Sequence, residues 1–263
     1  MKPLVIHAGF HKTGTSTVQR FFQDNRKALA PHVVIVLKRD MEDLIRAARG
    51  YSVTGSILNR AKIVLRAEAL FSSLKGRPKR ALLLSAEELS GHMPGRPGTL
   101  DYRAAEVILG DIVRVARAVM PRRAVSLVLG TRAPAAWIES AYWEHVKSSS
   151  LTSDFADFAQ KFHTASDLSA VAREIASRVA PVVEVPLETA VKGTGLVAPI
   201  LDLLDLPIGF SAQLSPPQMR NQRDPDWMLQ EFLRINRKVA DRSERARLKK
   251  ALRRGERPTQ GAD

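Results

Sequence analysis

A glycine-flanked stretch near the N-terminus has the composition of an anion-binding loop. Residues 9–17 read Gly-Phe-His-Lys-Thr-Gly-Thr-Ser-Thr, between a short apolar run and a segment with apolar residues at helical spacing. The N–H groups at the start of a helix attract negative charge, and glycine lets the backbone approach a phosphate closely. We therefore predict a P-loop-like phosphate-binding loop whose cation is Lys12 and whose other anion-binding residues are Thr13, Gly14, Thr15 and Ser16.

This loop departs from the Walker pattern G-x-x-x-x-G-K-[ST] of Mg–nucleotide sites. Gly9 and Gly14 keep the spacing, but Thr15 stands where the lysine would be. The apolar run 125–131 leads into Arg132, whereas an ATPase needs an acidic residue beside the loop to hold Mg²⁺. Both departures favour a metal-free anion site. The pair Glu87-Glu88, which follows another apolar run, leaves a metal site open.

A second candidate anion site follows the run 125–131. Arg132 comes directly after it, Pro134 favours a helix start, and Ser140 lies eight residues beyond the arginine. A guanidinium group can bind a phosphate through two hydrogen bonds, and a serine one to two helical turns further on can reach the same oxygens. A basic run, Arg220-Asn221-Gln222-Arg223, lies further along the chain.

These two stretches together resemble the PAPS-dependent sulfotransferases, where PAPS is 3′-phosphoadenosine 5′-phosphosulfate. His11-Lys12-Thr13-Gly14-Thr15-Ser16 is similar to their 5′-phosphosulfate loop, and Arg132 with Pro134 and Ser140 is similar to their 3′-phosphate motif. The resemblance implies an enzyme that moves a sulfuryl group from PAPS to an acceptor hydroxyl without a metal. Cytosolic relatives often have proline at the position of His11. The loop is closer to bacterial and carbohydrate-type members, which implies a glycan as one class of acceptor.

The implied reaction needs a cation at the leaving oxygen and a general base for the acceptor. The resemblance gives the first role to Lys12. Glu87 and Glu88 follow the apolar run 81–85, and one of them is expected to face the ligand because extended residues alternate sides. Glu87 is the first choice for the base, and Glu88 and His11 remain alternatives.

The elements that position these residues are those of an α/β fold. Nearly continuous apolar runs at 4–8, 33–37, 81–85, 125–131 and 182–185 predict strands buried on both faces of a sheet. Helical patterns lie between them, so we expect a doubly wound, mainly parallel sheet. Residues 91–98 form a Gly/Pro loop, and Asp224-Pro225 predicts a helix start with Asp224 as N-cap. We expect a sulfotransferase-like α/β domain over 1–240 and a basic tail over 241–263.

Composition narrows the remaining alternatives. The chain of 263 residues has no cysteine, which excludes disulfides, thiolate metal sites and a cysteine nucleophile. Its net charge of +14 is high, and such a field suits nucleic acid, an anionic membrane surface or an acidic substrate. Two other functions compete with a sulfotransferase. The P-loop-like stretch leaves open a kinase-like enzyme that uses Mg–ATP. The positive charge leaves open a basic nucleic-acid-binding module, although no nucleic-acid motif favours it. No apolar stretch is long enough for a signal peptide or a membrane span, so a cytoplasmic location is expected.

Overall fold

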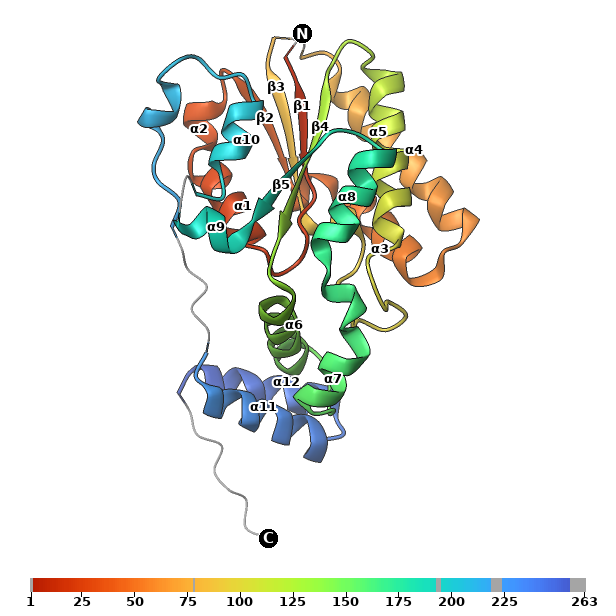
Figure 1. The fold of residues 1–263 in the computed structure, drawn as a ribbon, viewed down its shortest axis with the longest axis vertical. Coiled ribbons are helices and arrows are strands. Elements are labelled where there is room, and N and C mark those ends of the chain that lie inside the picture. The colour runs from red at the N-terminus through yellow and green to blue at the C-terminus, as the bar shows by residue number, and fades with distance from the viewer. Residues whose placement is uncertain (1, 78, 193–194, 219–223, 256–263) are drawn as a thin grey trace.

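Five parallel strands form one sheet in the structure, a computed structural model that describes residues 2–77, 79–192, 195–218 and 224–255. The strand order is β2-β3-β1-β4-β5 (Figure 1). The strands are β1 (Leu4–His7), β2 (Val33–Leu37), β3 (Ala81–Ser85), β4 (Val125–Thr131) and β5 (Val182–Pro186). All four strand pairs are parallel, and each strand lies at or within one residue of its predicted position. The predicted α/β class with a parallel sheet is therefore confirmed.

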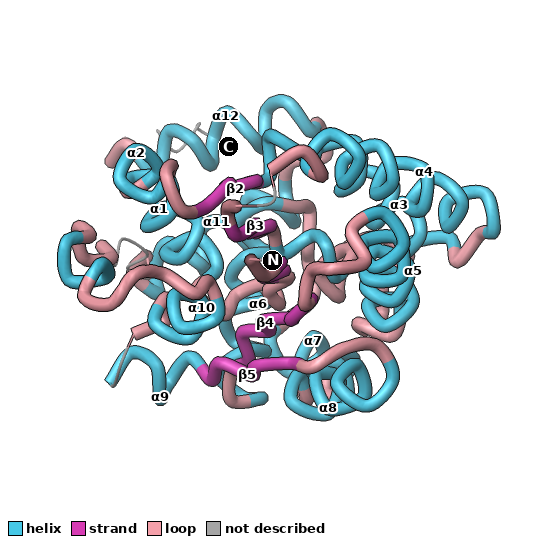
Figure 2. Tube along the Cα trace, turned by 90° about the horizontal axis from the view of Figure 1, so that it is seen from above, coloured by secondary structure: helices cyan, strands magenta, loops and turns pink. Residues whose placement is uncertain are grey.

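Helices cover both faces of this sheet (Figure 2). One face carries α1 (Thr15–Asp24), α2 (Arg26–Leu29), α9 (Leu187–Lys192) and α10 (Ala198–Leu203). The other face carries α3 (Glu42–Thr54), α4 (Ile57–Leu74), α5 (Ala104–Val119) and α8 (Leu168–Arg178). This arrangement is consistent with a doubly wound fold.

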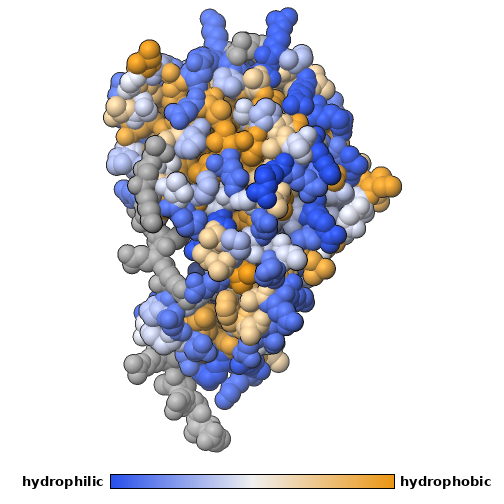
Figure 3. All heavy atoms as spheres, in the orientation of Figure 1, coloured by the Kyte–Doolittle hydropathy of each residue, from blue (hydrophilic) through white to orange (hydrophobic). Residues whose placement is uncertain are grey.

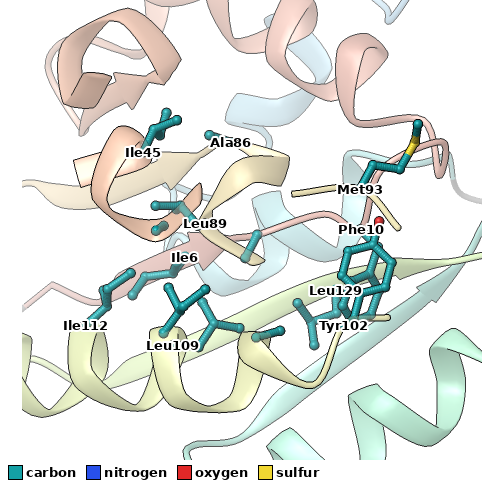
Figure 4. Close-up of a cluster of buried hydrophobic side chains, with 14 of the residues drawn as sticks. Ile6, Phe10, Ile45, Ala86, Leu89, Met93, Tyr102, Leu109, Ile112 and Leu129 are labelled. Atoms are coloured by element: carbon teal, nitrogen blue, oxygen red, sulfur yellow. The ribbon is translucent and has the colours of Figure 1, made fainter. Parts of the chain in front are cut away.

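Two hydrophobic cores explain why the strands read as continuous apolar runs. Leu4 and Ile6 of β1 pack into the core shared with α3, α4 and α5, while Val5 between them packs into the core shared with α1. Figure 4 shows part of the first core, in which Ile6 lies near Leu109 of α5. Successive strand residues point to opposite faces, so both faces must be apolar when helices cover both.

A third group of helices lies beyond the carboxyl ends of the strands (Figure 1). It consists of α6 (Pro134–Ser148), α7 (Phe155–Phe162), α11 (Asp226–Lys238) and α12 (Arg242–Arg253). The ammonium group of Lys249 in α12 donates to the carbonyl oxygens of Val146 and Ser149, at 2.6 and 2.8 Å, where α6 ends. Residues 242–253, predicted as part of a basic tail, therefore form a helix packed against the rest of the fold.

The predicted start of the helix after residue 224 is wrong by one position. Pro225 has an extended backbone with ψ of 149° and is the N-cap, so Asp224 lies outside the helix. The carbonyl oxygen of Pro225 accepts the first helical hydrogen bond, from the N–H of Met228 at 2.9 Å. Asp226, not Asp224, supplies the negative charge in the first turn.

The surface gives no sign of a membrane-spanning element in the described part of the chain. None of its helices is both long enough and apolar enough to cross a bilayer. On the face drawn in Figure 3, hydrophilic side chains surround smaller groups of apolar ones.

Candidate functional site

A cavity of about 820 Å³ lies at the carboxyl ends of the strands. The sheet order explains its position. β1 is central, and the chain leaves β1 toward the β2 side of the sheet but leaves β4 toward β5. Connections that diverge in this way leave a crevice outside the strand ends, where ligands bind in open α/β sheets. Nine of the ten predicted site residues line the cavity: His11, Lys12, Gly14, Thr15, Ser16, Glu87, Glu88, Arg132 and Ser140.

Thr13 is the predicted site residue that does not line the cavity. Its side chain is buried, and its Oγ1 donates to the carbonyl oxygen of Phe10 at 2.6 Å. It packs so closely on β4 that a Cβ added to Gly130 would lie 2.6 Å from this Oγ1. The hydroxyl of Thr13 therefore holds the loop against the sheet, and only its backbone could face a ligand.

The loop between β1 and α1 is a tight turn that needs its glycines. Gly9 and Gly14 both have φ of +88°, a conformation that side chains disfavour. A Cβ at Gly9 would lie 2.8 Å from the Cβ of Glu87, and one at Gly14 would lie 2.6 Å from a methyl carbon of Leu196. Lys12 also has a positive φ, of 65°, at a position that lines the cavity.

Helix α1 begins at the cavity with its positive end. Gly14 is the N-cap, and the N–H groups of Thr17 and Val18 are the first to bond to its carbonyl oxygen. No acidic residue lies in the first turn, and no side chain from the described part of the chain caps it. The N–H groups of Thr15 and Ser16, which precede the first helical hydrogen bond, lie at residues lining the cavity. This helix end can bind an anion.

Arg132 and helix α6, which follows it, hold the β1–α1 loop in place. A guanidinium nitrogen of Arg132 donates to the carbonyl oxygen of Lys12 at 3.2 Å, and the indole N–H of Trp137 donates to the carbonyl oxygen of His11 at 3.0 Å. The ammonium of Lys12 lies 3.1 Å from a carboxylate oxygen of Glu144. Two segments more than 100 residues apart thus meet at one point of the cavity.

This contact favours the ionised form of Glu144. Burial alone would raise the pKa of its carboxyl group, but the charge of Lys12 and its hydrogen bond outweigh burial, and Lys147 adds to them. The pKa is therefore lowered. Sequence reasoning missed Glu144, since no pattern connects a residue in the middle of α6 with the β1–α1 loop.

Arg132 and Ser140 both line the cavity, Arg132 from just before the N-cap of α6 and Ser140 from its second turn. The N-terminus of α6 itself carries an anion from the protein, because the N–H of Ala133 donates to a carboxylate oxygen of Glu188 at 3.1 Å. A bound phosphate would therefore meet the side chains of Arg132 and Ser140 rather than this helix end.

Glu87 and Glu88 lie in a 3-10 turn, η2 (Glu87–Ser90), and not in the extended conformation expected. The alternation argument therefore fails, and both residues line the cavity. Glu88 is buried, and one of its carboxylate oxygens accepts from the ammonium of Lys38 and, at 2.5 Å, from the guanidinium of Arg49. Glu87 accepts a hydrogen bond from the side-chain amide of Gln19 at 2.6 Å.

His11 has a neutral imidazole at neutral pH. Burial lowers the pKa of His11 to about 3, and the nearby charges of Arg49 and Lys38 act in the same direction. Its Nδ1 lies 3.0 Å from the hydroxyl oxygen of Tyr102, a buried residue below the loop. An imidazole with so low a pKa is a weak base, which disfavours His11 for that role.

Several cavity residues were not among the predicted site residues: Lys38, Arg49, His92, Arg96, Glu144 and Lys147. The predicted Gly/Pro loop 91–98 contained a usable signal, since a loop that follows a strand of a parallel sheet lies at its carboxyl edge. The run Arg220–Arg223 lies outside the described residues.

In the described part of the chain, no group of three or more His, Asp or Glu side chains is placed to hold a metal ion. No protein-family model matches the chain, and no curated protein matches its sequence.

Proposed function

We propose that this protein is a PAPS-dependent sulfotransferase. The observation that carries the proposal is the meeting of its two sulfotransferase-like stretches in one cavity, joined by the hydrogen bond from Arg132 to the carbonyl oxygen of Lys12. The resemblance of each stretch was found separately in the sequence. Their convergence at the switch point of the sheet is what a single nucleotide with phosphates at both ends would require.

The donor site combines a helix end with fixed cations. The N-terminus of α1, with Gly14, Thr15 and Ser16, supplies N–H donors for the 5′-phosphate. Arg132 and Ser140 supply a guanidinium and a hydroxyl for the 3′-phosphate. The cavity of about 820 Å³ falls within the range of small-molecule and cofactor sites.

The chemistry follows from the charges of the cavity. The donor supplies a sulfuryl group whose bond to the bridging phosphate oxygen breaks as the bond from sulfur to the acceptor oxygen forms. Lys12 stabilises the negative charge that develops on the bridging oxygen. The acceptor proton passes to a base, and the product nucleotide keeps the bridging oxygen as part of its 5′-phosphate.

Glu87 is the base that the cavity favours. Glu88 is buried and bound by Lys38 and Arg49, so its carboxylate is occupied as a structural anion. His11 is a weak base because its pKa is lowered to about 3. Glu87 receives a hydrogen bond from the neutral Gln19 alone among the described residues, which leaves lone pairs for a proton.

The test is a calorimetric and thermal-shift titration with 3′-phosphoadenosine 5′-phosphate (PAP), ADP and ATP, each with Mg²⁺ and with EDTA. PAP should bind in EDTA, more tightly than ADP, and raise the melting temperature by mass action. Tight ATP binding that requires Mg²⁺ would instead support a kinase-like enzyme. Salt-sensitive binding of random-sequence DNA without PAP binding would support a nucleic-acid-binding module.

A further inference from the structure

One end of the cavity is lined by basic residues that the proposed donor site does not use. Lys38 follows β2 in η1 (Lys38–Met41), Arg49 belongs to α3, and His92 and Arg96 belong to the loop 91–98. We call these four residues the basic end. They come from the β2–β3 side of the sheet, whereas Arg132 and Ser140 come from the chain that leads to β5.

The basic end carries more positive charge than its own carboxylate neutralises. Glu88 accepts from both Lys38 and Arg49 through the same oxygen, Oε1. One buried carboxylate thus offsets one of the two cations, and Arg96 adds another, hydrogen bonded to the neutral hydroxyl of Ser148 at 2.8 Å. The sum over Lys38, Arg49, Arg96 and Glu88 is two positive charges, or one if Glu87 is included.

Two buried atoms at this end also lack a hydrogen-bond partner among the described residues. They are the Nε of Arg49 and the Oε2 of Glu88. Leaving such groups unsatisfied costs free energy, because each has lost its contact with water. The guanidinium of Arg49 and the carboxylate of Glu88 are therefore not fully satisfied by the described protein groups.

The loop that carries His92 and Arg96 is fixed in place. The N–H of His92 donates to the hydroxyl of Ser52 in α3 at 2.9 Å. On the other side, the imidazole of His145 in α6 donates from Nε2 to the carbonyl oxygen of Pro94 at 2.8 Å. A Cβ at Gly95 would lie 2.5 Å from that same nitrogen, so loop and helix are in close contact. Arg96 is thus held by a loop anchored to both α3 and α6.

The two histidines near these cations do not contribute to the charge. Burial, and after it the charges of Arg49 and Arg96, lower the pKa of His92. The pKa of His11 is lowered to about 3, by burial and then by nearby charges that include Arg49, Lys38 and Arg96. The excess positive charge therefore comes from lysine and arginine and persists at neutral pH.

We propose that the basic end binds an oxyanion carried by the acceptor, so that the substrate is an acidic hydroxyl compound and not a neutral alcohol. A neutral acceptor that covered these cations would remove them from water without replacing the lost solvation. A carboxylate or sulfate ester would replace it with charge-assisted hydrogen bonds. The assignment of the basic end to an acceptor rests on the proposed sulfotransferase function.

Arg96 offers the cleanest variant for a test. Its hydrogen-bond partner, Ser148, is neutral and exposed, so Arg96→Gln leaves no buried carboxylate without its cation. Loss of Lys38 or Arg49 would instead leave Glu88 with one cation fewer. Arg46→Gln is the matched control. It makes the same arginine-to-glutamine change in α3, one turn before Arg49, at an exposed arginine outside the cavity.

The experiment measures binding to PAP-saturated protein of two matched probe pairs. The pairs are p-nitrophenyl β-D-glucuronide with p-nitrophenyl β-D-glucoside, and 4-hydroxybenzoate with 4-hydroxybenzyl alcohol. The acid of at least one pair should bind about 10- to 100-fold more tightly than its neutral partner, as expected for a charge-assisted hydrogen bond. Arg96→Gln should remove most of that preference and leave the PAP affinity unchanged, and Arg46→Gln should alter neither.

The outcomes separate this inference from the proposed function. If PAP does not bind, the proposed function fails, and the acceptor site fails with it. If PAP binds but neither acid is preferred, or no probe binds, the inference alone is refuted. A loss of PAP affinity in Arg96→Gln but not in Arg46→Gln also refutes it, because the basic end would then belong to the donor site.

Discussion

Replacing Glu144 by glutamine should strengthen the binding of PAP. The change keeps the shape of the side chain but removes a negative charge 3.1 Å from the ammonium of Lys12. An anion bound to the other side of that ammonium, at about 3 Å, would lie about 6 Å from the Glu144 carboxylate. The present carboxylate therefore repels the very ligand that Lys12 attracts.

The size of this effect follows from Coulomb's law. Two unit charges about 6 Å apart repel by about 3 kcal/mol at an effective dielectric constant of about 20. The side chains of Lys12 and Glu144 are 30% and 25% exposed, so solvent screening reduces the effect. We take about half, or ~1.5 kcal/mol, which is roughly a tenfold gain in affinity.

Isothermal titration of PAP into both proteins at low and high salt is the assay. Glu144→Gln should bind about tenfold more tightly at low salt, with a smaller gain at high salt. The lowered pKa of Glu144 means that it is ionised at neutral pH, so the gain should disappear only as the pH falls through that lowered pKa. Glu231→Gln, at a residue of α11 outside the cavity, is the control. Unchanged or weaker PAP binding in Glu144→Gln would refute the reasoning.

Four further predictions concern single residues. Glu87→Gln should reduce turnover by about 10²- to 10⁴-fold without changing PAP affinity, as loss of a general base does; full activity would remove Glu87 from that role. Arg132→Ala should weaken PAP by about 1.5–3 kcal/mol more than it weakens ADP, and an equal loss for both ligands would place Arg132 away from the 3′-phosphate. Gly9→Ala should lower the free energy of unfolding by about 3 kcal/mol, because it strains a φ of +88° and brings a methyl group 2.8 Å from the Cβ of Glu87; Gly55→Ala, which has a positive φ but no neighbour within 4 Å, should cost less in the same urea titration. Burial lowers the pKa of His145 to about 4. The unfolded chain therefore binds the extra proton between about pH 6.5 and that value, so this group should reduce stability as the pH is lowered through that range, by at most about 1.4 kcal/mol per pH unit. His145→Gln should flatten the slope in urea titrations at pH 4.5 to 6.5, and an unchanged slope would contradict the lowered pKa.

The strands were predictable because the signal for each of them, a run of apolar residues, lies within the strand's own sequence. Val33–Leu37 and Ala81–Ser85 are apolar along their length since helices cover both faces of the sheet, and the structure places both strands at the predicted residues. The same reasoning located the cavity edge, because the residues that follow parallel strands must gather at one edge. Nine of the ten predicted site residues line the cavity for this reason.

What the sequence could not supply was the pairing of side chains across the cavity. Lys38, Arg49 and Glu88 form one cluster although they come from three segments. No local pattern encodes such a contact, which depends on where the loops lie once the sheet has formed. The local error at Glu87 and Glu88 has a different origin: the buried Ala86 is the last extended residue, and the chain then turns at once into η2.

Helix α6 is fixed at both ends by charges of the sign that its dipole favours. The carboxylate of Glu188 accepts from the N–H of the N-cap residue, Ala133, and the ammonium of Lys249 binds carbonyl oxygens at the other end. Ser140 and Glu144 lie between these two contacts, so contacts at both ends of the helix fix the positions of these two residues. A random-mutagenesis screen for inactive protein should therefore recover changes at Glu188 and Lys249, although neither residue lines the cavity. Truncation of the chain before α12 should also inactivate the protein, because it removes Lys249 and with it the contact at the end of α6.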